Sequence, residues 1–266
     1  MSTTPQPLTP DSPSVLRDDH AGVATLTLNR PAQFNTLSHA MIGTLRGALA
    51  TIALDSTVRV VVLASTGRAF STGHDLKELR AQRDRAFLTR LLEDCSQMMQ
   101  AIVALPQPVI AQVQGIATAA GCQLVASCDL ALAGRSARFA TSGINYGLFC
   151  ATPAVALSRT VARKHALEML FTGDFIDADK AAAIGLINQA VEDADLAAEV
   201  ATLATKLARK SAYAMKLGKA SFYQQSNQPL DTAYRCAAAD LIANLLAEDG
   251  LEGLNAFVEK RAPRFE

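Results

Sequence analysis

Short apolar segments before residue 195 predict a series of β-strands. VATLTLNRP alternates larger apolar or β-branched residues with others and ends at Pro31. VRVVVLAS, VIAQVQG and DLALAG are continuous apolar runs, which are typical of buried strands. GLINQAVE gives the last such signal. The strands are therefore expected to form the interior of the protein.

Between these strands, apolar residues recur at helical spacing. NTLSHAMIGTLRGALATI places Leu37, Met41, Leu45 and Leu49 on one face, and DRAFLTRLLEDCSQMMQAIVAL predicts a longer amphipathic helix that ends at PQP. ATAAGCQLVAS predicts a third helix. Strand, turn and helix recur with a period of about 50 residues, so we predict an α/β fold built from repeated β-turn-α units.

The same pattern predicts three parts of the chain. Residues 1–16 are rich in Pro, Ser and Thr, and we expect a disordered leader there. Residues 17–194 carry the alternating strands and helices and form the core. Residues 195–266 show only helical signals, with many Ala and Leu, and predict a helical region that packs on the core or on a neighbouring subunit.

The composition limits the classes of molecule that the protein is expected to bind. The 266 residues include 25 Lys and Arg and 25 Asp and Glu, and 50% of them are hydrophobic. This balance, without a basic run, predicts no binding of nucleic acid or of an anionic membrane. No apolar run has the length of a membrane span. The histidines show no metal-ligand spacing, so we predict no metal site; they are His20, His39, His74 and His165.

Cysteine usage and the N-terminal residues predict a location. The leader has neither the basic start nor the apolar core of a signal peptide, and Asp11, Asp18 and Asp19 argue against a transit peptide. The five cysteines form no CxxC pair, and disulfide bonds between them would leave one cysteine unpaired. Reduced thiols are therefore expected. They are Cys95, Cys122, Cys128, Cys150 and Cys236. We therefore predict a cytoplasmic protein.

Two segments share the order strand, small-residue turn, helix: VVVLASTGRAFSTGHDL and VIAQVQGIATAAGCQL. The first backbone N–H groups of a helix have no intrahelical acceptor, and the helix dipole makes that end favourable for negative charge. If the two turns are adjacent, their N–H groups can form an oxyanion hole. The alternative is that Ala119, Ala120 and Gly121 only permit close packing of helix and strand.

The chain resembles the crotonase superfamily, also called the enoyl-CoA hydratase/isomerase family, from about Val23 to Phe265. The resemblance rests on LNRPAQFNTLSHAM, GRAFSTGHDLKEL, PQPVIAQVQGIATAAGCQLVASCDLALA, ARFATSGINYGLF, ALEMLFTGDFIDADKAAAIGLINQAV and GLNAFVEKR, in this order. One subgroup of the family shares the GHDLKEL turn, AAGCQLVASCD and GLFC.

This resemblance implies a spiral of β-β-α units, a C-terminal helical trimerisation region and a homotrimer or dimer of trimers. It implies a lyase of acyl-CoA and fatty-acid metabolism that stabilises a thioester enolate. Coenzyme A would be part of the substrate, with no separate cofactor. The family's oxyanion donors fall on the backbone N–H groups of His74 and Ala120. A backbone role for His74 is favoured over acid–base chemistry of its ring.

The chain departs from the family at both catalytic glutamates. Their positions hold Gln123 and Gly143, and neither residue exchanges a proton near neutral pH. Weak hydration is therefore expected, and restoring both glutamates should raise it if the backbone keeps the family's geometry. Gln123 either holds a water or a substrate carboxylate or is a structural amide. Decarboxylation of a malonyl-type acyl-CoA and a non-catalytic acyl-CoA-binding scaffold are the alternative functions.

Further residues are candidates for substrate binding. Gly73 and Gly121 belong to the two turns, and Asp75 is expected to cap the helix after the first turn. Cys150 is interpreted as a buried thiol rather than a nucleophile because no paired histidine is evident. Lys260 is either a phosphate ligand or an ordinary solvated helix end. The remaining candidates are Gln33, Ser71, Thr118, Ser142, Tyr146 and Phe257.

Overall fold

The computed structural model describes residues 12–265. Most of the expected leader, residues 1–11, lies outside the described residues. Its last two residues, Val15 and Leu16, already belong to the first strand, β1 (Val15–His20). The first strand therefore begins slightly earlier than the predicted core boundary at residue 17.

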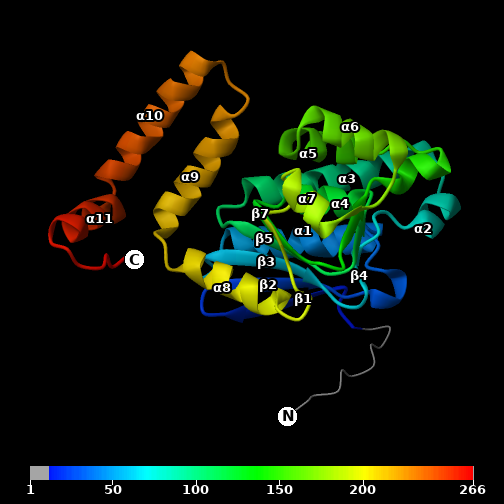
Figure 1. The fold of residues 1–266 in the computed structure, drawn as a ribbon, viewed down its shortest axis with the longest axis horizontal. Coiled ribbons are helices and arrows are strands. Elements are labelled where there is room, and N and C mark those ends of the chain that lie inside the picture. Colours follow the sequence, from blue (N-terminus) through cyan, green and yellow to red (C-terminus); the bar gives the residue numbers. More distant parts are fainter. Residues whose placement is uncertain (1–11, 266) are drawn as a thin grey trace, which may run out of the picture.

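Two sheets form the centre of the protein (Figure 1). The six-stranded sheet has the order β1-β2-β3-β5-β7-β10, in which only β1 runs antiparallel to its neighbour. After β1 its strands are β2 (Val23–Leu28), β3 (Val60–Ser65), β5 (Val109–Val113), β7 (Leu130–Gly134) and β10 (Gln189–Val191). The four-stranded sheet has the order β4-β6-β8-β9. Its strands are β4 (Ala69–Ser71), β6 (Ile116–Thr118), β8 (Arg138–Ala140) and β9 (Ile176–Asp177).

The chain alternates between these two sheets. β3, β5 and β7 lie in the larger sheet, and each is followed after a few residues by a strand of the smaller sheet, β4, β6 or β8. Two of these pairs lead into helices: β4 into α2 (Leu76–Ala81) and β6 into α4 (Ala120–Ser127). This order confirms the predicted spiral of β-β-α units.

Helices cover both faces of the larger sheet. Alternate residues of β3 point to opposite sides, so Val61 and Leu63 join one buried cluster and Val60 and Val62 join the other. The first cluster includes α1 (His39–Ala53) and α3 (Arg85–Ala104), and the second includes α8 (Leu196–Ala208). Figure 1 shows α8 on the side of the sheet opposite α1 and α3. The other elements are η1 (Pro31–Gln33), η2 (Ser142–Tyr146), α5 (Ala151–Thr160), α6 (Arg163–Thr172) and α7 (Ala178–Ala183).

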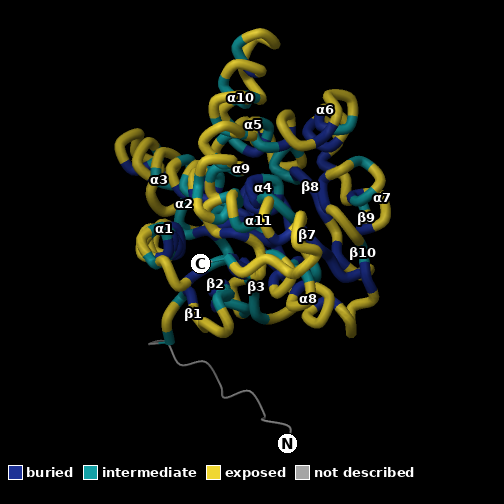
Figure 2. Tube along the Cα trace, turned by 90° about the vertical axis from the view of Figure 1, so that its left-hand side faces the viewer, coloured by how far each residue is buried: buried dark blue, intermediate teal, exposed yellow. Residues whose placement is uncertain are grey.

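The C-terminal helices α9 (Ala212–Gln225), α10 (Leu230–Leu246) and α11 (Glu248–Val258) extend away from the core (Figure 1), and we call them the arm. The helical signal after residue 195 is confirmed, but it covers two different parts, because α8 belongs to the core. Large apolar side chains of the arm are exposed, and α10 is mostly exposed in Figure 2. They include Phe222, Leu230, Tyr234, Leu241, Ile242, Leu246, Leu251, Leu254, Phe257 and Val258.

Within residues 12–265, none of the helices is both long enough and apolar enough to cross a membrane.

Candidate active site

The two predicted turns lie against each other. Strands β4 and β6 pair in parallel, with Ser71 opposite Ala117, so both chains leave the small sheet at the same edge. Gly73 follows β4 with φ +82°, and a Cβ atom built on it would lie 2.9 Å from the backbone nitrogen of Ala120. A Cβ atom on Gly121 would lie 2.1 Å from the Ser71 carbonyl oxygen. The glycines thus allow close contact between the two backbones.

Ala120 is the first residue of α4, so its N–H group has no acceptor within the helix. The preceding residue, Ala119, has φ +51° and ψ −122°, a conformation that a residue with a side chain rarely adopts. Such a conformation costs on the order of 1–3 kcal/mol and persists only where the surrounding structure holds it. It turns the chain sharply from β6 into α4, and the Ala120 nitrogen lies beside the Gly73 turn.

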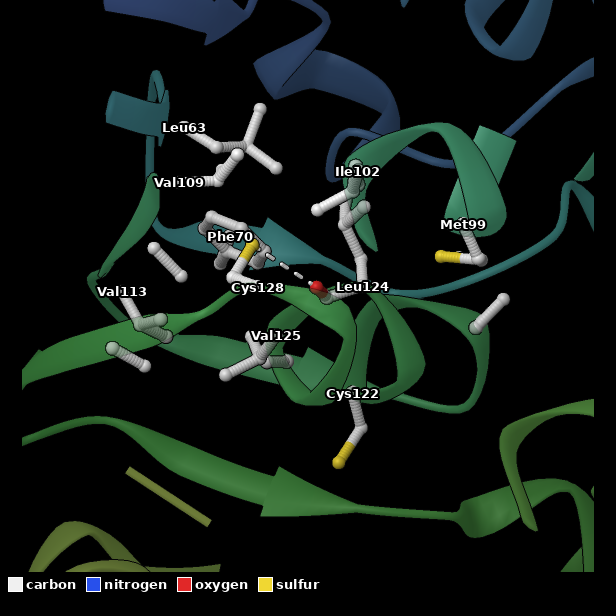
Figure 3. Close-up of a cluster of buried hydrophobic side chains, with 14 of the residues drawn as sticks. Leu63, Phe70, Met99, Ile102, Val109, Val113, Cys122, Leu124, Val125 and Cys128 are labelled. Atoms are coloured by element: carbon white, nitrogen blue, oxygen red, sulfur yellow. Dashed lines mark hydrogen bonds between the residues drawn. The ribbon is translucent and has the colours of Figure 1, made fainter. Parts of the chain in front are cut away.

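The core holds α4 rigidly. Figure 3 shows its side chains among apolar residues of β3, β5 and α3, with Leu124 and Val125 pointing into this cluster. The Cys128 thiol donates to the Leu124 carbonyl at 3.3 Å. Burial raises the pKa of Cys122 to about 12, so this thiol is inert near neutral pH. The N-terminus of α4 is therefore a fixed group of backbone donors.

The His74 ring is half-buried and turned toward Leu37. Its Nδ1 lies 3.3 Å from the Leu37 carbonyl oxygen, which can only accept, so Nδ1 carries the proton. Nε2 is buried and has no hydrogen-bond partner among the described residues. Burial lowers the pKa of His74, so the ring is neutral at pH 7. The ring thus anchors the turn, and Asp75 caps α2 through the backbone N–H groups of Lys77 and Glu78, as expected.

The lowered pKa predicts a specific pH dependence of stability. Because His74 titrates at lower pH in the folded protein than in the unfolded chain, the unfolded chain binds more protons below pH 6.5. The contribution of His74 to the free energy of unfolding is complete above about pH 6.5, the ordinary pKa of histidine. It is lost as the pH falls from there to the lower pKa of the folded state. We expect the free energy of unfolding to fall less between pH 7 and pH 5 in His74→Asn, whose amide can still donate to Leu37. Urea titrations at several pH values test this; parallel curves for both proteins would contradict it.

Gln123 lies one helical turn after Ala120 and is 5% exposed. Side chains of a helix lean toward its N-terminus, so this amide leans toward the start of α4 and Ala120. Its Oε1 atom, which can only accept a hydrogen bond, is buried without a partner among the described residues. The amide carries no titratable proton.

The Gly143 position is closed. A Cβ atom there would lie 2.5 Å from the Leu148 carbonyl oxygen and 2.8 Å from the Cys150 sulfur. The Leu148 N–H donates to the Gly143 carbonyl at 3.0 Å, and a Gly143 backbone hydrogen bond reaches the Cys150 thiol. Burial raises the pKa of Cys150, which supports a buried thiol rather than a nucleophile. A side chain at residue 143 has no room unless the Leu148 carbonyl and the Cys150 sulfur move. Sequence reasoning missed Leu148, which no local signal identifies.

The other candidates fall into three groups. Thr118 and Ser142 join their hydroxyl groups at 2.8 Å and bridge β6 to η2 near the site. Ser71 is structural, because its hydroxyl donates to the Asn35 carbonyl at 2.8 Å and accepts from the Gly73 N–H at 3.3 Å. The exposed candidates are Gln33, Tyr146, Phe257 and Lys260.

Phe257 and Lys260 lie in or just after α11, in the arm, which Figure 1 shows well apart from α2 and α4. A single chain therefore does not bring them to the two turns. Within residues 12–265, no group of three or more His, Cys, Asp or Glu side chains is arranged to hold a metal ion.

A cavity of about 260 Å³ lies at the opposite end of the larger sheet. Its lining includes Val58, Gln107 and Pro108, just before β3 and β5, and Tyr213 and Lys216 of α9. The two turns lie beyond the other ends of the same parallel strands. This cavity is therefore separate from the site that the turns form.

Comparisons with known proteins identify the family of the chain. The family model for enoyl-CoA hydratase/isomerase matches residues 18–266. The rat protein named enoyl-CoA hydratase domain-containing protein 3, mitochondrial, is 46% identical over 242 residues, which cover 91% of this chain and 81% of that one. The subgroup that shares the sequence motifs bears this name.

Two solved structures superpose closely. An enoyl-CoA hydratase from Mycobacterium smegmatis has a TM-score of 0.94 at 52% identity and covers 96% of this chain and 99% of its own. The human enoyl-CoA hydratase domain-containing protein 3 has a TM-score of 0.93 at 44% identity, with 95% and 100% covered. Both likenesses extend over the arm as well as the core.

These relatives correct the predicted location. The rat, frog, mouse, human and zebrafish relatives are all named as mitochondrial, which contradicts a cytoplasmic protein. The prediction relied on acidic residues near the N-terminus and on unpaired cysteines. All five cysteines are free thiols in the structure, but free thiols do not distinguish one reducing compartment from another.

Proposed function

The chain belongs to the enoyl-CoA hydratase/isomerase family, and we propose that it binds an acyl-CoA thioester with the thioester oxygen at the backbone N–H groups of His74 and Ala120. The two donors would stabilise the negative charge that develops on this oxygen when the thioester becomes an enolate. Coenzyme A enters as part of the substrate, and no separate cofactor is proposed.

The observation that carries this proposal is the contact between the two turns. The Gly73 turn approaches the Ala120 nitrogen so closely that no Cβ atom fits between them. Ala119 adopts a strained conformation at the same point. Backbone strain of this kind is often found at functional sites, so it supports a functional role for the start of α4.

Hydration is expected to be weak in this site. Addition of water to an enoyl thioester needs a group that activates the water and a group that delivers a proton to the α-carbon. Each such group contributes about 10²–10⁴-fold. Gln123 cannot supply a proton in this way, and the backbone around Gly143 excludes a side chain.

A second candidate is decarboxylation of a malonyl-type acyl-CoA, which the same neutral site favours. The bond between the α-carbon and the carboxylate breaks, its electron pair forms the enolate, and CO₂ leaves. Solvent then protonates the α-carbon. This step needs the oxyanion donors and no carboxylate base. Gln123 can donate a hydrogen bond to the substrate carboxylate, a contact that a glutamate would oppose by charge repulsion. A third candidate, a non-catalytic acyl-CoA-binding scaffold, would bind these thioesters without turnover.

We further propose a homotrimer or a dimer of trimers in which the arm completes the site of a neighbouring copy. The exposed apolar side chains of the arm are more than a soluble monomer usually leaves uncovered. Phe257 is 84% exposed and Lys260 is exposed, so both are available to coenzyme A held by another subunit. An ammonium group suits a phosphate of the coenzyme.

The oxyanion proposal is tested with a ligand that lacks the acceptor. We expect butyryl-CoA to bind about 30-fold more tightly than S-butyl-CoA, the thioether without the carbonyl oxygen. Two hydrogen bonds to a neutral carbonyl contribute about 1 kcal/mol each, and about 1.4 kcal/mol corresponds to a factor of ten. Isothermal titration calorimetry measures both affinities, with free coenzyme A as the baseline. Equal affinities for thioester and thioether would refute the proposal.

A further inference from the structure

A buried polar cluster joins the arm to the core. Lys219 of α9 has a side chain that is only 8% exposed. Its ammonium group donates to the Ile102 and Gln107 carbonyl oxygens at 2.9 and 3.0 Å and to Asp129 Oδ2 at 2.6 Å. The three N–H donors of a lysine thus have three acceptors. Ile102 lies in the last turn of α3, where free carbonyl groups favour a cation.

Asp129 connects this cluster to the rest of the core. Its Oδ1 accepts from the Tyr223 hydroxyl, also on α9, at 2.9 Å, and its Oδ2 accepts from the Val109 N–H at 2.7 Å. Asp129 lies between the end of α4 and the start of β7, and Val109 begins β5. We call Lys219, Tyr223 and Asp129 the arm anchor. The anchor fixes α9 to three core elements at once.

A buried charged cluster of this kind adds little net free energy of unfolding to a protein. Taking a charged ammonium out of water is costly, and burial lowers the pKa of Lys219 although Asp129 opposes that shift. Apolar side chains of similar size would hold α9 at least as strongly. Hydrogen bonds, however, depend on direction, whereas apolar contacts do not. No residue of α9 is buried as a whole, but the Lys219 side chain is, so the anchor supplies directional contacts between α9 and the core.

We propose that the arm anchor is a positioning device that aims the arm, so that Phe257 and Lys260 reach the coenzyme site of a neighbouring copy. This inference rests on the proposed function. Because α10 and α11 both contact α9, a tilt of α9 carries Phe257 and Lys260 with it. Hydrogen bonds to a ligand tolerate only small changes in distance and angle, so such a tilt is enough to break them.

Hydrogen exchange measured by mass spectrometry on the full-length protein tests the anchor directly. We expect about tenfold faster exchange in α9–α11 of Lys219→Met, and a smaller increase in Tyr223→Phe, with exchange in β2, β3 and β5 unchanged. Tyr223→Phe removes one hydroxyl group and keeps the packing, so it guards against a Lys219→Met protein that fails to fold. Lys216→Met, an exposed lysine on the same helix, is the matched control and should behave as the wild type.

Coenzyme A affinity and mass measured by light scattering complete the test. Weaker coenzyme A binding by about tenfold in the anchor variants, with the oligomer mass unchanged, supports aiming of the arm. Unchanged exchange in the arm of both variants would overturn the anchor. An arm loosened in a protein that is a monomer, or that binds no coenzyme A, would keep the anchor as the support of α9 and overturn its aiming role together with the proposed assembly. The two failures are therefore distinguishable.

Discussion

Replacing Gly73 with alanine should abolish recognition of the thioester carbonyl. The new Cβ atom would lie 2.9 Å from the Ala120 nitrogen, 3.0 Å from the Ala119 Cβ and 3.1 Å from the Thr118 carbonyl oxygen. Gly73 also has φ +82°, which a residue with a side chain rarely adopts. Neither the turn nor the start of α4 can absorb the methyl group without separating the two N–H donors.

We expect the preference for butyryl-CoA over S-butyl-CoA to fall from about 30-fold to below about threefold in Gly73→Ala, since both carbonyl hydrogen bonds are lost. Any turnover should fall by at least about 10²–10³-fold, which is the usual effect of losing one oxyanion donor, because both are lost here. Gly185→Ala is the control. Gly185 has φ +83°, but the nearest atom to its built Cβ is 3.9 Å away. A preference retained in Gly73→Ala, with an unfolding transition like that of Gly185→Ala, would remove the two turns from the site.

Strands β2, β3, β5 and β7 of the larger sheet were predictable because they are long enough to show a pattern. The three-residue β10 was located only through the longer run GLINQAVE around it, and β1 was not predicted. The VRVVVLAS run encodes β3, whose residues face two buried clusters and therefore leave no polar alternation. The smaller sheet had no such signal. Its strands have two or three residues, fewer than a hydrophobic period needs to become visible. Their pairing depends on where the preceding strands end.

The division of the C-terminal helices was not predictable for a different reason. α8 and α10 are both rich in Ala and Leu, so composition alone does not distinguish a core helix from an arm helix. They differ in what covers their apolar face: the larger sheet covers Val200 of α8, whereas Leu241 of α10 is exposed. That difference arises from the path of the chain between the two helices.

The candidate site was likewise predictable only in part. The two turns follow from local sequence, because small residues between a strand and a helix indicate close backbone approach. The closure of Gly143 involves Leu148 and Cys150, which fold back on it through η2. The anchor joins Asp129 to Lys219 across 90 residues. Contacts between segments this far apart in the chain have no signature in a single sequence. An aspartate or a lysine is usually a solvated surface residue, so neither residue alone indicates the anchor.

Replacing Gly143 with glutamate is therefore expected to damage the fold rather than restore hydration. The Leu148 carbonyl belongs to the backbone and cannot rotate away, and the Cys150 sulfur is buried, so η2 and the start of α5 must shift. Forcing a side chain into such a closed space costs about 1–3 kcal/mol of unfolding free energy. The carboxylate would then lie where the displaced backbone leaves it, and not at the α-carbon of a bound thioester.

Denaturant unfolding and a crotonyl-CoA hydration assay measure both consequences in Gly143→Glu and in the double variant with Gln123→Glu. We expect no gain in hydration in either protein, because general acid–base catalysis needs the proton carrier within hydrogen-bond reach of the reacting atom. Gly43→Glu is the matched control: it adds the same charge to an exposed position of α1, where a built Cβ meets nothing within 4 Å. Its stability should equal or exceed that of the wild type, since glutamate favours a helix more than glycine does. Hydration that rises about 10²-fold or more in the double variant, at wild-type stability, would mean that the segment from Leu148 to Cys150 opens readily, and the closed site would then be one of two accessible states.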